Sequence, residues 1–429
     1  MKVGRICTCG IVCLSMGWLA GCSSGEGYPD GVAPAVETPR AFFETPTPFI
    51  PPTVEPTDTP EMTIRSIKAG WGFTLALGSD GGVKCWGAGY LCDGSTVHKS
   101  TPVDKQELAG GVAAITAGGG HACALTGEGG VKCWGSNNFG QLGNDTREES
   151  STPMDVVGLT GGVSAIAAGS SHTCALTDGG GVKCWGENGF GQLGDGTLNL
   201  SRVPVDVSGL TSGAVAISAG GTHTCAVMAG GGVKCWGFNG DGQLGNNNTI
   251  ETADRFRSTP TDVEGLTEPV VELALGGHTT CARTERGRVK CWGYRENGQL
   301  GNGVLPETQK AHTGTPVDVF GLTEGVASIT VGMSTACALT AAGGVLCWGV
   351  KTGADDPAAR KMSFVPVPVS GFAGGGAAVS AGDMHVCILT VTGAVKCWGA
   401  NMFGQLGDGT ENNSDLPVEV IGLAGLPEG

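Results

Sequence analysis

The sequence lacks the features that mark several functional classes. It holds 25 Lys and Arg against 40 Asp and Glu, a formal net charge of −15, and no stretch that is convincingly helical. Because an acidic surface is repelled by DNA, RNA and anionic lipid headgroups, we expect no nucleic-acid partner. The chain also has no nucleophile elbow, no glycosidase-like motif and no pair of carboxylates singled out by its context. We therefore expect no catalysis and no cofactor.

The N-terminal apolar stretch is too short to span a bilayer comfortably. Ile6–Ala20 follows two basic residues, which is the pattern of a signal peptide. Residues 19–22, Leu-Ala-Gly-Cys, then resemble the lipobox of bacterial lipoproteins. In that family the signal, here residues 1–21, is removed, and the Cys, here Cys22, carries the acyl chains. An ordinary secretory signal is the alternative.

The lipobox resemblance implies a location in the bacterial cell envelope. Ser23 and Ser24 lack the Asp that retains such proteins at the inner membrane, which favours lipid anchoring at the outer membrane, on its surface or its periplasmic side. Residues 22–61 hold the lipidated Cys and a Pro/Thr-rich tether with nine of the 21 prolines. Such a composition cannot bury a core, so we expect the tether to be disordered. Residues 62–429 then form one repeat domain.

A repeated unit dominates residues 62–429. Its fullest form reads A-G-x-x-H-x-C-A-L-x-x-x-G-G-V-K-C-W-G-x-N-x-x-G-Q-L-G, and successive copies are 48 to 56 residues apart. A period of this size marks a repeat architecture, so residues present in every copy are first explained as parts that build the copy. The closing Cys-Trp-Gly of the seven copies lies at Trp86, Trp134, Trp185, Trp236, Trp292, Trp348 and Trp398.

The second copy predicts an antiparallel hairpin. Apolar residues alternate on both sides of a Gly-rich stretch, and folding about Thr126–Gly130 places Cys123 opposite Cys133 and Leu125 opposite Val131. One register satisfies both pairs. Each copy therefore contributes a hairpin that ends just before its tryptophan.

Two further short strands are expected in front of each hairpin. In the second copy they come from residues 112–116 and from the Pro-Val-Asp segment that begins at residue 102. Four-stranded units repeated seven times about an axis make a β-propeller. We expect the tryptophans to pack one blade on the next, and the His-x-Cys histidines to have structural roles, with contact to a ligand as the alternative.

The cysteines fit the hairpins. Because the chain is expected to be exported, and because all fourteen cysteines of the repeats are accounted for, the spacing argues for disulfides. Zinc is the competing interpretation, since each copy offers His-x-Cys and a second Cys, but the sixth copy has Thr335 at the His position. We expect no metal at these residues and leave calcium in the Gly-Gln-Leu-Gly turns open. The expected disulfides are Cys85–Cys92, Cys123–Cys133, Cys174–Cys184, Cys225–Cys235, Cys281–Cys291, Cys337–Cys347 and Cys387–Cys397.

The unit V-x-x-I-x-A-G-x-x-H-x-x-A-L, followed by G-x-V-x-x-W-G and N-x-x-G-Q-L-G, resembles the regulator of chromosome condensation repeat over about residues 62–429. The resemblance implies an all-β, seven-bladed β-propeller. It also implies a closure in which one end of the chain completes a blade begun by the other. Residues 417–420 would then join the segment 64–87, which removes free sheet edges. Family activities do not transfer with the fold.

Differences between the copies indicate where a partner could bind. Copies four and five are followed by insertions after Gly-Gln-Leu-Gly, at residues 249–259 and 304–313, and residues 351–361 of copy six form a third variable loop. Loops from adjacent blades should share one face, and Arg and aromatic residues are frequent interface anchors. A tolerated insertion is the alternative. The candidate partner-binding residues are Arg255, Phe256, Arg257, Lys310 and His312.

These observations together favour a binding protein. We expect a monomeric, membrane-anchored scaffold outside the cytoplasm that recognises an unidentified protein or glycan through one propeller rim without catalysis. A propeller enzyme and a structural component of the envelope are the alternatives.

Overall fold

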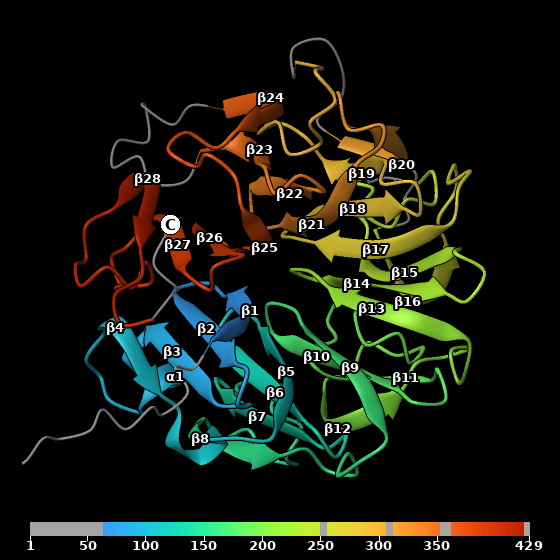
Figure 1. The fold of residues 1–429 in the computed structure, drawn as a ribbon. Helices are drawn as coiled ribbons and strands as arrows, with labels where there is room; N and C mark the ends of the chain where they lie inside the picture. Colours follow the sequence, from blue (N-terminus) through green and yellow to red (C-terminus); the bar gives the residue numbers. More distant parts are fainter. Residues whose placement is uncertain (1–62, 249–254, 306–311, 352–361, 424–429) are drawn as a thin grey trace, which may run out of the picture. The chain divides into compact units, whose positions relative to one another are not determined.

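The computed structural model describes residues 63–248, 255–305, 312–351 and 362–423, all within one compact unit, Asp58–Gly429. The predicted signal peptide, Cys22 and the tether lie outside the described residues. The described chain forms seven four-stranded antiparallel sheets arranged as the blades of a β-propeller, as Figure 1 shows. The all-β, seven-bladed fold class predicted from the repeats is therefore confirmed.

The strands follow one another around the ring in chain order, and every blade is continuous in sequence. Blades 1 to 4 comprise β1 (Ile64–Ala69), β2 (Phe73–Gly78), β3 (Val83–Gly87), β4 (Lys99–Asp104); β5 (Val112–Ala117), β6 (His121–Thr126), β7 (Val131–Gly135), β8 (Ser150–Asp155); β9 (Val163–Ala168), β10 (His172–Thr177), β11 (Val182–Gly186), β12 (Ser201–Asp206); and β13 (Ala214–Ala219), β14 (His223–Met228), β15 (Val233–Phe238), β16 (Phe256–Asp262). Blades 5 to 7 comprise β17 (Val270–Leu275), β18 (Thr279–Thr284), β19 (Val289–Tyr294), β20 (His312–Asp318); β21 (Val326–Val331), β22 (Thr335–Thr340), β23 (Val345–Val350), β24 (Met362–Pro368); and β25 (Gly376–Ala381), β26 (His385–Thr390), β27 (Val395–Gly399), β28 (Ser414–Glu419).

Helix is nearly absent from the described part of the chain. It is confined there to α1 (Gly89–Cys92) and a single 3₁₀ turn, η1 (Gln106–Leu108). Neither of these has the length and apolar character of a membrane-spanning helix, and the described residues contain no other candidate.

The central hairpin of each blade has the register that the alternation predicts. In blade 2, Cys123 lies opposite Cys133 and Leu125 opposite Val131, with the turn closed by a bond from Gly129 N to Thr126 O of 3.0 Å. All fourteen cysteines of the described residues are disulfide-bonded, in the seven pairs that the spacing suggests. Each such bond closes a short loop and stabilises its blade by roughly 2–3 kcal/mol.

The blade boundaries differ from the prediction. The Pro-Val-Asp strand β4 pairs with β3 of the preceding copy rather than with the hairpin that follows it. The fourth strand of blade 2 is β8, whose Asp155 lies opposite Lys132 with an Nζ–Oδ1 distance of 2.6 Å. Each sheet therefore consists of one inner strand, the hairpin and the segment that follows it.

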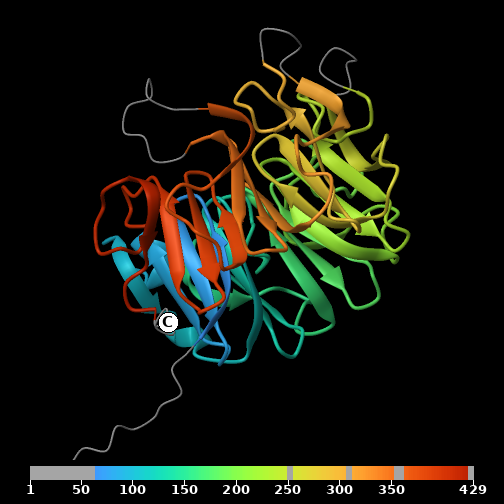
Figure 2. The same cartoon turned by 45° about the horizontal axis from the view of Figure 1, so that its top comes forward.

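The predicted exchange of strands at the closure is wrong for the same reason. Seven copies supply seven complete blades, so none remains open for a strand from the other end of the chain. The terminal strand β28 pairs with β27 in blade 7, with Val418 opposite Cys397. Figures 1 and 2 show blades 7 and 1 side by side, and Ala69 N of blade 1 bonds Ser380 Oγ of blade 7 at 3.0 Å.

Seven hydrophobic clusters fill the seven junctions between blades, and each contains the Cys-Trp-Gly tryptophan of the following blade. At the junction of blades 2 and 3, Trp185 packs on Leu125, Val131 and Leu142. Six of the seven tryptophans are at most 2% exposed. The expectation that they join the blades is confirmed, and no tryptophan stripe faces solvent at these positions.

The Ala-Gly glycine of each copy, which follows Leu275 in copy five and Val331 in copy six, belongs to a closed ring around the propeller axis. A methyl group added at any of the seven would lie within 3.0 Å of the carbonyl oxygen of the equivalent glycine in the next blade. Blade 7 meets blade 1 in this way, because a Cβ at Gly382 would collide with Gly70 O. The inner strands are therefore as close as their backbones permit. The ring consists of Gly70, Gly118, Gly169, Gly220, Gly276, Gly332 and Gly382.

We predict that Gly169→Ala lowers the free energy of unfolding by about 1–3 kcal/mol, because the new methyl would lie 2.5 Å from Gly220 O and also against the ring of His172. Gly179→Ala in the same blade is the control, since nothing lies within 4 Å of its added methyl. Chemical denaturation of the oxidised proteins measures both. Equal stability of the two variants would contradict the glycine ring.

Candidate interaction face

The first and third strands of every blade run in the same direction and end on one side of the ring. We call this side the upper face. It carries the Ala-Gly-x-x-His loops near the axis and, farther out, the segments that contain Gly-Gln-Leu-Gly. The described residues that flank the insertions of copies four to six lie between third and fourth strands and so also belong to this face.

A hydrogen-bonded node joins adjacent blades beneath the upper face. Between blades 3 and 4, the main-chain oxygen of Gln192 accepts bonds of 2.9 Å from both Thr224 Oγ1 and Trp236 Nε1. Thr224 Oγ1 also lies 2.9 Å from His172 Nε2. Four junctions have this node, formed by His121, Thr173, Gln141 and Trp185; His172, Thr224, Gln192 and Trp236; His223, Thr280, Gln243 and Trp292; and His385, Thr74, Gln405 and Trp86.

The node fixes the tautomer of its histidine. A threonine hydroxyl has a single proton, and Thr224 donates that proton to the carbonyl of Gln192. His172 must therefore donate from Nε2, and its Nδ1 is the unprotonated nitrogen. Burial lowers the pKa of His172 to about 3 and that of His121 to about 4. The node histidines are thus neutral structural residues, which agrees with the structural role expected of them.

Histidine and threonine occur together across the junctions. Wherever a blade has the His, the next blade has Thr at the node position; after Phe73, Thr279 and Thr335 the next blade has Ala122, Ala336 and Val386. A threonine without the histidine, or the reverse, is absent from all seven junctions. A buried hydrogen-bond donor without an acceptor destabilises the fold more than a pair of apolar residues does. The histidine and the threonine are therefore either both present or both absent. Sequence comparison within copies missed this rule because the partners lie in neighbouring copies.

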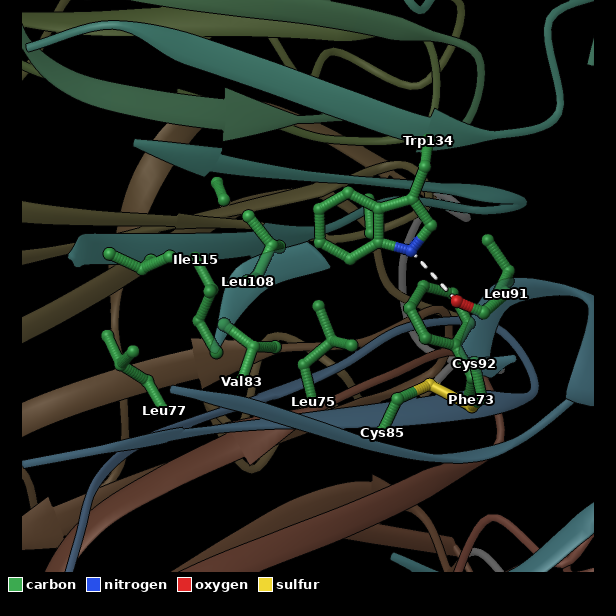
Figure 3. Packing of buried hydrophobic residues seen from close by; sticks show 13 residues of the cluster. Phe73, Leu75, Leu77, Val83, Cys85, Leu91, Cys92, Leu108, Ile115 and Trp134 are labelled. Atoms are coloured by element: carbon green, nitrogen blue, oxygen red, sulfur yellow. Dashed lines mark hydrogen bonds between the residues drawn. A yellow bond between two sulfur atoms is a disulfide. The ribbon is translucent and has the colours of Figure 1, made fainter. Parts of the chain in front are cut away.

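The first copy replaces the Gly-Gln-Leu-Gly turn with α1. Trp134 Nε1 donates to Leu91 O at 2.8 Å, so Leu91 supplies the acceptor that the glutamine carbonyl supplies elsewhere. Leu91 and Cys92 pack in the same apolar cluster as Trp134 (Figure 3). The Cys85–Cys92 disulfide ties α1 to β3. The extra cysteine of the first copy thus secures a substitute for the missing turn.

Metal and acid–base chemistry have little support at the repeated residues. The cysteines that zinc would need are in disulfides, and the described residues contain no group of three or more His, Cys, Asp or Glu side chains placed to hold a metal. The turn carboxylate of Asp195 accepts a bond of 2.9 Å from Thr197 N, and that of Asp408 one of 3.0 Å from Thr410 N. Both act as turn residues.

In blades 4, 5 and 6, which carry the insertions, the sheet extends further at the upper face, and we call this extension the raised edge. Their fourth strands β16, β20 and β24 are each one residue longer than those of the other blades. The extra pairs are Phe238 with Phe256, Tyr294 with His312, and Val350 with Met362.

The described candidate residues from the insertions lie on the fourth strands of two adjacent blades, or directly before them. Phe256 and His312 occupy equivalent positions on adjacent blades, and Phe256 is 42% exposed. Arg255 is exposed and Arg257 is half-buried, next to Phe256. Lys310 lies outside the described residues.

An aromatic row leads from this edge towards the propeller axis. The ring of Phe238 lies 5.0 Å from that of Phe190 and 5.3 Å from that of His278, between ring centroids. His278 Nδ1 lies 2.7 Å from Asp241 Oδ2. The row spans blades 3, 4 and 5, and each blade contributes from a different position of its repeat. In the sequence, His278 lies three residues before Cys281 rather than two, and no pattern in the copies predicts the row.

The fold and its junctions define a seven-bladed β-propeller built from repeats of the regulator of chromosome condensation type. Residues 13–317 match the family described as "RCC1-like domain", and residues 377–405 and 392–427 match "Regulator of chromosome condensation (RCC1) repeat". Since the first match alone spans more than half of the 429 residues, the chain belongs to the RCC1-like family.

Curated relatives share part of the chain. "RCC1 domain-containing protein RUG3, mitochondrial" of Arabidopsis thaliana is 35% identical over 198 residues, which are 44% of this chain and 42% of the relative. "Ultraviolet-B receptor UVR8" of Arabidopsis thaliana is 29% identical over 250 residues, 56% of each chain. The matched part is thus about half of each of these relatives.

Solved structures agree with the fold. Human WBSCR16 is similar with a TM-score of 0.65 and 23% identity, over 75% of this chain and 84% of that one. Yeast RCC1 (Prp20), solved with Kap60 bound to it, has a TM-score of 0.64 and 22% identity, over 74% of this chain and 78% of that one. At this identity the likeness shows the fold alone.

We predict that Thr224→Ala destabilises the protein by about 1–3 kcal/mol, because the buried Nε2–H of His172 loses its acceptor. Adding His172→Phe recreates the residue pair of the first junction and should recover part of the loss. A double-mutant cycle from denaturant unfolding measures a coupling of at least about 0.5 kcal/mol. Additive effects would contradict the node.

The same histidines make the fold sensitive to acid. Their pKa values, about 3 to 4 when folded, lie below the ordinary value of 6.5, so the unfolded chain binds more protons as the pH falls below 6.5. Each histidine should lower the free energy of unfolding by about 2 kcal/mol between pH 6.5 and 5. The His172→Phe/Thr224→Ala protein should lose about 2 kcal/mol less over that interval, measured by denaturant unfolding at each pH. An unchanged pH dependence would refute the assignment.

Proposed function

We propose that this chain is a membrane-anchored scaffold outside the cytoplasm that binds a protein or glycan partner through its upper face and has no catalytic activity. The observation that carries the proposal is the raised edge with its aromatic row. These side chains differ between copies, whereas the residues common to the copies are occupied in building the junctions.

The composition of the face suits an interface. Exposed Phe256 on β16, with Arg255 next to it, and exposed Met362 on β24, two blades further on, provide the aromatic, arginine and methionine groups that are enriched at binding surfaces. The edge is continuous with the rings of Phe238 and His278. A partner seated on it would therefore reach from the rim towards the axis.

The disulfides support the proposed compartment. Disulfides persist in oxidising environments and are rare in the cytosol, and here they occur in every blade. The lipobox-like residues 19–22 supply the means of attachment, with Cys22 as the acylated residue. The names of the relatives describe a receptor and an organellar protein, and we transfer neither role.

We predict that the oxidised mature chain captures a discrete partner from envelope or culture-fluid fractions of its source cells. Changing Arg255, Phe256 and Arg257 together to Ala should abolish capture by removing the anchors of the raised edge. The control changes exposed residues of turns at the opposite side, Arg286→Ala with Val391→Ala. Loss of the partner with the control but not with the triple change would refute this face. Capture of nothing would refute a protein partner and lead to a glycan array.

We predict that the chain incorporates an alkyne-labelled fatty acid when expressed in Gram-negative cells and fractionates with membranes. Cys22→Ser should abolish labelling and release the protein into the soluble fraction, because the acylated thiol is lost. Persistent labelling of the Cys22→Ser protein, or an unlabelled wild type, would contradict the lipid anchor.

A further inference from the structure

A cavity of about 390 Å³ opens at the upper end of the propeller axis. Its walls are the ends of the inner strands and the Ala-Gly loops of all seven blades. This volume lies at the lower end of the range of small-ligand pockets. Because glycines and alanines make up more than half of its lining, main-chain groups are directly accessible to a ligand there.

The chemistry of the lining favours a positive charge. Among the described residues that form the walls there is no Lys and no Arg, while Asp383 contributes a carboxylate. Burial raises the pKa of Asp383 above its ordinary value, with no neighbouring cation to offset the cost of desolvation. The side chain is half-buried by area and belongs to the cavity wall. A cation bound in the cavity would give the Asp383 carboxylate an opposite charge, which the described wall residues do not provide.

The rest of the wall reinforces this polarity. His278 lines the cavity with Asp241 behind it, and Tyr294 lines it while donating from its hydroxyl to Glu296 Oε2 at 2.6 Å. Two further carboxylates thus stand behind aromatic groups. The ring face of a tyrosine and the thioether of Met333, another wall residue, suit the aliphatic and charged parts of an organic cation.

The nearby basic groups are engaged elsewhere. Lys68 lies on the inner strand β1, where desolvation lowers its pKa and the charge of Glu272 opposes that shift. Glu272 Oε2 in turn lies 2.6 Å from Arg283 Nε. Arg295 is buried and directs its Nη2 towards Val304 O at 3.4 Å. None of these cations is among the described residues of the cavity wall.

We propose that the axial cavity binds an organic cation, an ammonium or guanidinium group, with Asp383 as its charge partner and Tyr294 and Met333 as the walls against its aliphatic stem. The group comes either from a free amine or from a Lys or Arg side chain of the protein partner. The second source rests on the proposed function and specifies which residue that partner inserts at the axis.

The test is a calorimetric titration of the oxidised chain with butylguanidinium and butylammonium chloride, and with butylurea as a neutral control. We expect the cations to bind and butylurea to bind at least about tenfold more weakly. Asp383→Asn should weaken cation binding at least about tenfold, whereas Asp178→Asn, an exposed carboxylate of a turn at the opposite side, should leave it unchanged. An unaltered melting temperature shows that Asp383→Asn is folded.

Several results would overturn the proposal: equal binding of butylurea, no effect of Asp383→Asn, or no cation binding at concentrations of tens of millimolar. Acetyl-Gly-Arg-Gly-amide and its norleucine analogue then distinguish the sources. Tighter binding of the arginine peptide than of butylguanidinium supports a partner's side chain, and equal binding supports a free amine. No partner protein is present in these titrations, so their failure is separate from failure of the capture experiment.

Discussion

Four of the seven junctions between blades depend on one carbonyl oxygen that accepts two hydrogen bonds. At Gln192 this oxygen accepts one bond from a threonine and one from a tryptophan, so both of its lone pairs are used. The carbonyl belongs to the turn of one blade and the donors belong to the next. At these junctions one blade completes its neighbour, and Gln405 binds Thr74 and Trp86 of the first blade in the same way. The ring closes through these side chains without exchange of a strand.

The alternation of residues along the sequence predicted how the two strands of each hairpin pair. The prediction failed where a strand pairs with a strand of another copy. The hairpin register followed from Cys123, Leu125 and their opposite residues, because a single fold of the chain satisfies both pairs. The strand at residue 102 could be assigned to either of two copies, since alternation does not say which neighbour it bonds. The closure at residues 417–420 was expected from a family resemblance, and seven complete copies made it unnecessary.

The candidate site was predictable only where the copies differ in length. The insertions pointed to Phe256 and His312, which occupy equivalent positions of adjacent blades. The row of Phe190, Phe238 and His278 gave no such signal, because its members come from three positions of the repeat and meet only in three dimensions. The axial cavity was equally hidden, since its walls are mainly small residues, glycine and alanine, at positions that recur in the copies. Their small size serves the close approach of the inner strands, and it also leaves room at the axis.

The protonation of the histidines tests the junction account most directly. The chain has seven histidines, of which His121, His172, His223 and His385 belong to nodes. Long-range nitrogen–proton NMR of the histidine-labelled, oxidised protein reports the tautomer and charge of each ring as the pH is lowered. The account predicts four rings that are neutral, protonated at Nε2, and unchanged from pH 7 to about pH 5. Rings protonated at Nδ1, or four that titrate near the ordinary pKa of 6.5, would contradict it.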